Sequence, residues 1–162
     1  MTYWCRTAVL PDGARSSVRI EHAGGRITAI ESAVAARAGD IHLDSVFAGM
    51  GNAHSHAFHR ALRGRTHDGG GDFWQWRESM YEAAAALTPH SYRELATGVF
   101  AEMLAAGYTA VGEFHYVHHQ SDGTPYPDHA MEVALAAAAA DVGIRLTLLD
   151  TCYLAGGIDT RP

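Results

Sequence analysis

The sequence lacks the features that mark several large classes of protein. Only two cysteines are present, Cys5 and Cys152, and they stand far apart, so nothing indicates a disulfide framework. Positive charge is also scarce: the 162 residues carry a net charge of −6 with histidine neutral. Nucleic acids and anionic membranes are bound through basic patches, so the charge argues against both as partners. An acidic small substrate stays compatible, because one buried arginine can bind it locally.

Long apolar runs are missing as well. The alanine-rich stretches 83–87 and 134–140 are far too short to span a bilayer. Residues 1–6 have no basic segment followed by an apolar run, so no secretory signal is expected. We therefore expect a cytoplasmic protein in a reducing compartment. With 48% hydrophobic and 19% charged residues, the chain is expected to fold around a real core.

The pattern of turns and apolar residues predicts an α/β fold. Residues 1–47 are expected to be β-rich, with a hairpin of strands 17–21 and 26–30 around Gly24-Gly25. From there on strand and helix patterns alternate, which is typical of parallel strands with helical crossovers. The predicted strands are 44–50, 108–115 and 144–151, and the predicted helices are 73–87, 89–106 and 128–142.

Three short signals predict where helices begin and end. Thr88 followed by Pro89 is typical of an N-cap and first helical residue. Gly107 and Gly143 follow helical patterns and are expected to end them, because glycine readily adopts the left-handed backbone found just past a helix.

What the chain has in abundance is histidine. Its eleven histidines are internal rather than gathered at one end, which indicates metal binding or proton transfer rather than a tag. His54, His56 and His59 follow the predicted strand 44–50 closely. Residues two apart on a strand point to the same face, so the imidazoles of His54 and His56 can reach one metal ion. The alternative is a pair of solvent-facing histidines in a loop.

Three kinds of metal-binding fold use this His-x-His spacing. A metallo-β-lactamase pattern needs an aspartate where this chain has Phe58, and a cupin needs strands where helices are predicted. In the amidohydrolase superfamily the pair ends the first strand of a (β/α)8 barrel, after a small β-rich segment. That context matches residues 1–56. Three parallel strands do not close such a barrel, which takes roughly 250 residues.

Four segments together resemble one family of that superfamily, the formimidoylglutamate deiminases: GNAHSHAFHRAL, FWQWRESMY, EMLAAGYTAVGEFHYVHH and GIRLTLLDTCYLAGG. The resemblance extends from about Phe47 to Gly157, and FWxWR and EFHYxHH are its most specific motifs. It implies hydrolysis of N-formimino-L-glutamate to N-formyl-L-glutamate and ammonia in histidine degradation, with one divalent metal, zinc. It also implies the N-terminal part of an amidohydrolase-type TIM barrel at 48–162, preceded by a β-sandwich segment at 1–47.

Matched residue by residue, the resemblance implies roles for five side chains. His54 and His56 match metal ligands. Arg77 matches an arginine that holds a substrate carboxylate, a task that the planar guanidinium suits. Tyr116 matches a tyrosine that lines the substrate pocket. His59 stands where the family often has a glutamine that contacts substrate, and it keeps the capacity to hydrogen-bond.

In the family, the remaining ligands and the proton-transfer residues lie beyond position 162. The chain is therefore expected to be an N-terminal part that is inactive alone, and catalytic residues stay unassigned. The expected partner is a small molecule with carboxylates, and a homodimer of the full-length protein is compatible with the resemblance.

Three other interpretations stay open. One is a deaminase of the same superfamily that acts on a nucleobase or a guanidine, which a carboxylate clamp at Arg77 disfavours. Another is an inactive fragment whose histidines bind no metal. Glu113 and His115 share a strand face and form a further candidate pair, although His115, His118 and His119 are interpreted as structural.

Overall fold

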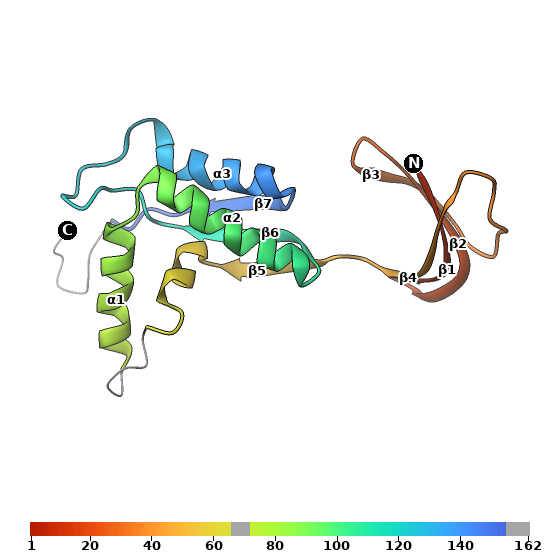
Figure 1. Ribbon diagram of the computed structural model, residues 1–162, viewed down its shortest axis with the longest axis horizontal. Coiled ribbons are helices and arrows are strands. Elements are labelled where there is room, and N and C mark those ends of the chain that lie inside the picture. The colour runs from red at the N-terminus through yellow and green to blue at the C-terminus, as the bar shows by residue number, and fades with distance from the viewer. Residues whose placement is uncertain (66–71, 155–162) are drawn as a thin grey trace. The chain divides into compact units, whose positions relative to one another are not determined.

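A computed structural model describes residues 1–65 and 72–154 of the chain (Figure 1). The chain divides into two units, Met1–Ala48 and Gly49–Pro162. The sequence predicts the boundary between the two parts after Phe47, one residue before the boundary in the structure. In the described residues, no helix combines the length and apolar character needed to cross a membrane.

The first unit is a four-stranded sheet in the order β3-β2-β1-β4. Its strands are β1 (Thr2–Leu10), β2 (Gly13–Ala23), β3 (Arg26–Glu31) and β4 (Ile41–Phe47). Neighbours pair in antiparallel fashion except β1 and β4, which are parallel. The predicted hairpin is confirmed: Gly24 and Gly25 join β2 to β3 with φ of +56° and +72°. Both angles suit a tight two-residue turn that needs glycine. The resemblance implied a β-sandwich segment for this part of the chain. The described residues form one sheet here, and a sandwich would need a second sheet packed against it.

A buried ion pair fixes the strand edges of this unit. Arg19 on β2 is only 9% exposed, and its Nε lies 3.2 Å from both carboxylate oxygens of Asp40. Glu21 also accepts from the guanidinium, and the backbone N–H of Arg37 donates to Asp40 at 2.8 Å. Asp40 stands just before β4, so the network ties the start of that strand to β2 on the other side of β1.

The second unit holds three parallel strands in the order β5-β6-β7. The strands are β5 (Met50–Ser55), β6 (Tyr108–His115) and β7 (Arg145–Asp150). Between them come the helices α1 (Phe73–Ala85), α2 (Pro89–Ala105) and α3 (Ala130–Val142), and the 3-10 turns η1 (Ala57–Leu62) and η2 (Pro127–His129). Helix α2 packs on α3 and β6, and α3 packs on β7 (Figure 1). This is the predicted α/β alternation.

The prediction of a single strand over residues 44–50 is wrong. The apolar run serves two sheets: β4 ends at Phe47 in the first, and β5 begins at Met50 in the second. The break falls at Ala48-Gly49. A Cβ on Gly49 would lie 2.2 Å from the Cγ2 of Thr109 on β6. Only glycine therefore fits at this position, where the backbone passes close to β6. The apolar pattern gives no sign of such a division, because residues 46–50 contain no charged or polar side chain.

The predicted helix ends are confirmed. Thr88 and Ser91 form a reciprocal capping box at the start of α2, with Pro89 in the first turn. Gly107 has φ of +91° just past α2, and Gly143 caps α3 with φ of +84°. Helix α3 begins at Ala130 instead of residue 128, because Asp128 and His129 themselves have positive φ.

Strand β6 separates two environments. Its buried side chains are Val111, Glu113 and His115, and Val111 belongs to the core that α2 and α3 cover. Phe114 points to the opposite face, because alternate residues of a strand do so. Any side chains gathered at the end of β6 therefore fall into two groups, one on each side of the sheet.

The Asp40 network makes the first unit sensitive to acid. The Arg37 N–H is the main cause that holds the pKa of Asp40 below its usual range; burial opposes it and Arg19 adds to it. A carboxyl whose pKa is lower when folded stabilises the fold above its unfolded pKa of about 4 and loses that effect as the pH falls through the folded value. We expect Asp40→Asn to lower the Tm at pH 7 and to flatten its decline below about pH 5. Circular dichroism at several pH values measures both.

The matched control is Asp44→Asn, which removes an exposed partner of Arg6. It is expected to change the Tm little, since exposed ion pairs contribute little. An acid profile of Asp40→Asn identical to that of the wild type would contradict the role of Asp40.

Candidate active site

The His-x-His pair lies at the carboxyl end of β5. His54 is the penultimate residue of the strand, and His56 follows it as the cap of η1. Their ring centroids are 4.9 Å apart and meet edge to face. The Nδ1 of His56 lies 3.0 Å from the carbonyl oxygen of Phe114 on β6. Donation from Nδ1 to that carbonyl leaves the Nε2 lone pair free, which is how proteins orient imidazoles that bind metals.

Glu113 holds the turn that carries these histidines. Its carboxylate accepts a hydrogen bond from the backbone N–H of Ala57, directly after His56, and also bonds Ser55. The side chain is completely buried, and burial raises the pKa of Glu113 against these two bonds. Among the described residues, no partner is found for its second oxygen. Glu113 thus couples β6 to the geometry of His54 and His56 without lining their cavity.

A cavity of about 340 Å³ opens beside the pair and collects all five residues assigned from the sequence. Four further parts of the chain contribute to it: η1, α1, the end of β6 and the segment after β7. Its lining residues are His54, His56, His59, Phe73, Trp76, Arg77, Met80, Phe114, Tyr116 and Tyr153. Of these, Phe73, Trp76, Met80, Phe114 and Tyr153 lie in the segments that carry the resemblance, but the sequence assigns them no role.

His59 and Tyr116 are bonded to each other on one wall of the cavity. The Nε2 of His59 lies 3.0 Å from the Tyr116 hydroxyl. Burial lowers the pKa of His59 to about 4, and the nearby His56 and His54 add to the effect. Burial likewise raises the pKa of Tyr116 to about 12. At neutral pH both groups are therefore uncharged and able to donate or accept hydrogen bonds.

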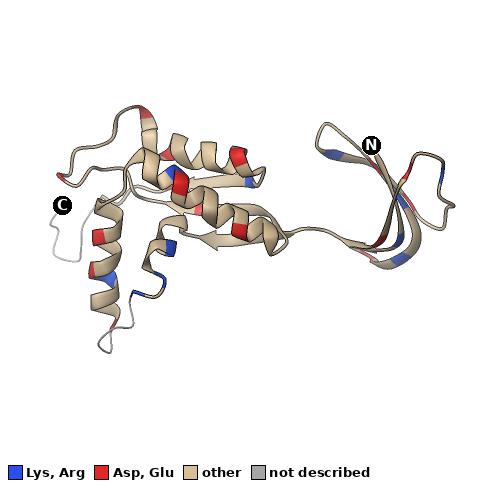
Figure 2. Cartoon of the chain, viewed as in Figure 1, with Lys and Arg blue, Asp and Glu red and all other residues tan. Residues whose placement is uncertain are grey.

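Arg77 brings a positive charge to the same cavity. Its Nε donates to the Tyr81 hydroxyl at 3.0 Å, and its guanidinium lies over the Tyr81 and Trp74 rings. Charged residues of both signs are interspersed along the helices and strands (Figure 2), and several pair, as Arg93 does with Asp141. In the described part of the chain, Arg77 has no carboxylate partner. Within those same residues its terminal N–H groups form no hydrogen bond, so they can contact an external anion.

A second group of titratable side chains lies on the other face of the sheet. It contains His115, His118, Glu132 and Asp150, whose ligand-type atoms lie within 4.8 Å of one another. The candidate pair of Glu113 and His115 is not one site: Glu113 bonds Ala57, whereas His115 lies beside Glu132. Sequence reasoning treated His115 and His118 as structural and gave no role to Glu132 or Asp150. The sequence did contain one signal for Asp150: it lies near the carboxyl end of a predicted strand, and the functional residues of barrel enzymes come from such ends.

With this geometry in view, comparison with known proteins identifies the family. The sequence model of the amidohydrolase family matches residues 45–156. The chain belongs to the amidohydrolase family. Residues 3–42 match the model described as formimidoylglutamate deiminase HutF, N-terminal domain. The second match lies within the first unit, and the amidohydrolase match begins in the last residues of that unit and covers most of the second.

Individual relatives agree with this assignment. A formimidoylglutamate deiminase of Pseudomonas aeruginosa is 42% identical over 96% of this chain and 35% of its own length. The crystal structure of an amidohydrolase from Brucella melitensis superposes with a TM-score of 0.86 at 45% identity, over 91% of this chain and 34% of that one. The atrazine chlorohydrolase of Arthrobacter aurescens, solved with zinc, shares the fold with a TM-score of 0.72 at 21% identity, over 91% and 35%. The chain thus spans about a third of the length of these relatives.

The role of Glu113 can be tested by paired substitutions. Glu113→Ala removes a buried acceptor and leaves a cavity, so we expect a loss of about 2–4 kcal/mol in the free energy of unfolding. Glu113→Gln keeps an acceptor for the Ala57 N–H and is expected to cost less than about 1.5 kcal/mol. Denaturant unfolding measures both, and imidazole NMR signals of His54 and His56 report whether the turn has moved.

Glu102→Ala is the matched control, because Glu102 forms an exposed pair with Arg60 and its loss is expected to cost about 0–1 kcal/mol. Equal losses for Glu113→Gln and Glu113→Ala would mean that the Ala57 bond does not account for the role of Glu113.

Proposed function

We propose that the whole protein hydrolyses N-formimino-L-glutamate to N-formyl-L-glutamate and ammonia. The observation that carries the proposal is the combination, in one cavity, of the His54/His56 pair with an arginine that has no carboxylate partner in the described residues. The similarity to a formimidoylglutamate deiminase over nearly the whole chain supports it. The activity is proposed for the whole protein, since this chain spans about a third of that relative.

We assign His54 and His56 as two ligands of one divalent metal, zinc. The donor chemistry fits: burial lowers the pKa of His56, so its imidazole is neutral near pH 7, and its Nδ1 is committed to Phe114. A bound zinc would supply Lewis-acid activation of water near neutral pH. In the structure described here, no Asp or Glu lines this cavity.

Arg77 is proposed to bind a carboxylate of the substrate. The Tyr81 hydroxyl accepts from the Arg77 Nε, and the Arg77 Cζ lies over the Trp74 and Tyr81 rings at 5.8 and 5.1 Å from their centroids. The two terminal nitrogens can then make a bidentate contact, which is stronger and more directional than a contact to lysine. Tyr116 and His59 are proposed to hydrogen-bond the substrate from the adjoining wall.

The proposed reaction balances as a hydrolysis of a C–N bond. Water adds its oxygen to the formimidoyl carbon, the bond from that carbon to the terminal nitrogen breaks, and ammonia leaves with the proton it gains. The glutamate part of the substrate is unchanged, so its carboxylates serve for binding alone. Binding and reaction thus involve different ends of the substrate, and the site likewise separates Arg77 on α1 from the imidazoles at the end of β5.

A nucleobase or guanidine deaminase is the second candidate from the same family. An adenosine deaminase of Xanthomonas campestris, solved with bound zinc, shares the fold at 21% identity with a TM-score of 0.66 over 90% of this chain and 32% of that one. Bases and guanidines carry no carboxylate, so they would leave the Arg77 guanidinium without an anion. The presence of Arg77 in the cavity favours the formimidoylglutamate assignment.

The metal assignment predicts the effect of removing both imidazoles. In the whole protein, His54→Ala/His56→Ala is expected to lower tightly bound zinc by one ion per chain and to abolish hydrolysis, since two of the proposed ligands are gone. Elemental analysis after dialysis against a weak chelator measures the stoichiometry. Zinc content equal to that of the wild type would reject His54 and His56 as ligands.

The carboxylate clamp predicts a change that depends on the substrate. Arg77→Met is expected to cost roughly 1.5–3 kcal/mol, a rise of about ten- to a hundredfold in KM for formimidoylglutamate. Arg77→Lys should restore the affinity only in part, because lysine lacks the planar fork. Tyr116→Phe should cost about 0.5–1.5 kcal/mol, the value of one neutral hydrogen bond.

Two controls make the Arg77 test specific. Arg93→Met removes a helix arginine that pairs with Asp141 outside the cavity and should leave KM unchanged. An N-alkylformamidine without carboxylates should react equally well with wild type and Arg77→Met. If Arg77→Met loses as much activity on that analogue as on formimidoylglutamate, Arg77 is structural.

A further inference from the structure

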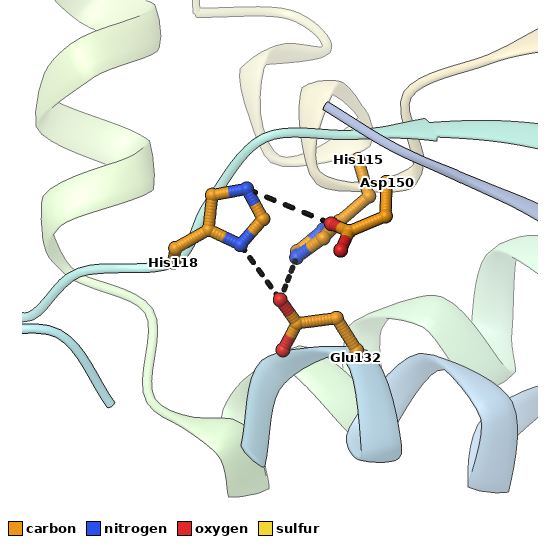
Figure 3. Close-up of side chains that lie close together, drawn as sticks. All are labelled: His115, His118, Glu132 and Asp150. Carbon is orange, nitrogen blue, oxygen red and sulfur yellow. Dashed lines mark hydrogen bonds and ion pairs between the residues drawn. The ribbon is translucent and has the colours of Figure 1, made fainter. Parts of the chain in front are cut away.

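The four side chains behind the sheet come from four separate parts of the second unit. His115 ends β6, His118 lies in the loop that follows, Glu132 is in the first turn of α3, and Asp150 ends β7. Figure 3 shows the side chains converging, with Glu132 reaching up from α3 toward both imidazoles. They lie on the face opposite to the cavity of His54 and His56, as the alternation along β6 requires.

The distances within this group are close to those of a coordination shell. Glu132 Oε1 lies 3.5 Å from His115 Nε2 and 2.7 Å from His118 Nδ1. A carboxylate oxygen of Asp150 completes the group, in which one ligand-type atom from each residue lies within 4.8 Å of the others. Ligand atoms arranged tetrahedrally about 2.0–2.1 Å from one ion are about 3.4 Å apart. Small side-chain rotations would therefore convert this arrangement into a shell around a single ion.

Each histidine already has one ring nitrogen committed and the other aimed at Glu132. His115 Nδ1 lies 3.5 Å from the buried Tyr92 hydroxyl, and His118 Nε2 lies 2.9 Å from the carbonyl oxygen of Thr151. That leaves His115 Nε2 and His118 Nδ1 facing the same carboxylate oxygen. Imidazoles that bind metals are commonly oriented in this way, by a hydrogen bond from the nitrogen that does not bind.

His115 supplies the most specific sign of a missing ligand. It is 1% exposed, and its Nε2 has no hydrogen-bond partner among the described residues. A buried polar atom without a partner is costly, so native structures rarely contain one unless an ion or water completes it. The atom faces Glu132 Oε1 at 3.5 Å, a separation that suits two ligands of one ion.

A second cavity, of about 370 Å³, gives an ion a path to this group. It is lined by three of the four side chains, His118, Glu132 and Asp150, and by further donors that include His119 and Cys152. Cys152 is exposed, so the cavity communicates with solvent. An accessible cavity and a complete set of donors are both required of a metal site.

From this geometry we propose that His115, His118, Glu132 and Asp150 bind a divalent transition-metal ion such as zinc. Two imidazoles and two carboxylates suit zinc and related ions better than magnesium, which prefers oxygen ligands alone. With four protein ligands the ion would be structural, and it would tie β6, its following loop, α3 and β7 together. That loop begins with Tyr116, so the ion would also fix one wall of the cavity on the other face.

Without the ion, hydrogen bonds hold these side chains together. His118 Nδ1 lies 2.7 Å from Glu132 Oε1, and His118 Nε2 lies 2.9 Å from the Thr151 carbonyl oxygen. Metal binding at Nδ1 would leave the bond from Nε2 to Thr151 in place. The same side chains thus form a hydrogen-bonded network without metal and a coordination shell with it.

The test separates this site from the one proposed at His54 and His56. Both of those residues are changed to alanine, the protein is stripped with a chelator, and Zn²⁺ or Co²⁺ is added in equilibrium dialysis. We expect one ion per chain to bind, with visible Co²⁺ absorption of tetrahedral type and a shift of the His115 Nε2 signal in NMR spectra. Added Glu132→Gln should weaken binding by at least about a hundredfold, since loss of an orienting group alone costs ten- to a hundredfold.

Asp150→Asn provides a second variant that does not endanger the core, because Asp150 is exposed. Asp141→Asn is the matched control: it removes a carboxylate from the same helix as Glu132, but one that pairs with Arg93. Asp141→Asn should leave metal uptake unchanged. The proposal is overturned if the His54→Ala/His56→Ala protein binds no ion, or binds one that Glu132→Gln and Asp150→Asn do not affect. Hydrolysis is not the readout, so failure here would leave the proposed deiminase function untouched.

Discussion

Strand β6 is the element on which both groups of histidines depend, because it lies between β5 and β7 and turns alternate side chains to opposite faces. Its Phe114 carbonyl orients His56 on one face, while His115 enters the second cluster on the other. Glu113 adds a buried bond from β6 to the turn after β5. A displacement of this one strand would therefore disturb every candidate ligand of the second unit.

The positions of these groups follow from a general property of parallel α/β sheets. The carboxyl ends of the strands meet at one edge, and residues just beyond those ends carry the chemistry in barrel enzymes. His54 on β5, His115 on β6 and Asp150 on β7 all lie at or next to such ends. The geometry of the second unit is thus that of a parallel α/β sheet with its chemically active side chains at the carboxyl edge.

Burial explains why two residues of the cavity, His59 and Tyr116, are uncharged at neutral pH beside a cationic one. His59 and Tyr116 share a hydrogen bond and are partly removed from water, which disfavours their charged forms. A guanidinium resists deprotonation, so Arg77 keeps its charge beside them. The cavity therefore combines two neutral hydrogen-bonding groups with one fixed positive charge, which suits a ligand that carries an anionic group.

The sequence by itself determined the α/β alternation, the capping of α2 at Thr88, the hairpin at Gly24-Gly25 and the strand over residues 108–115, because these depend on local pattern and backbone preference. Motif resemblance also selected the five residues that share the first cavity. Tertiary structure alone decided that the apolar run before the histidines divides between two sheets at Gly49. It also decided that Glu113 supports the His-x-His turn and that Glu132 and Asp150 join His115 and His118. These last contacts join residues far apart in the chain, and only the packing of α3 and β7 against β6 brings their side chains within reach of one another.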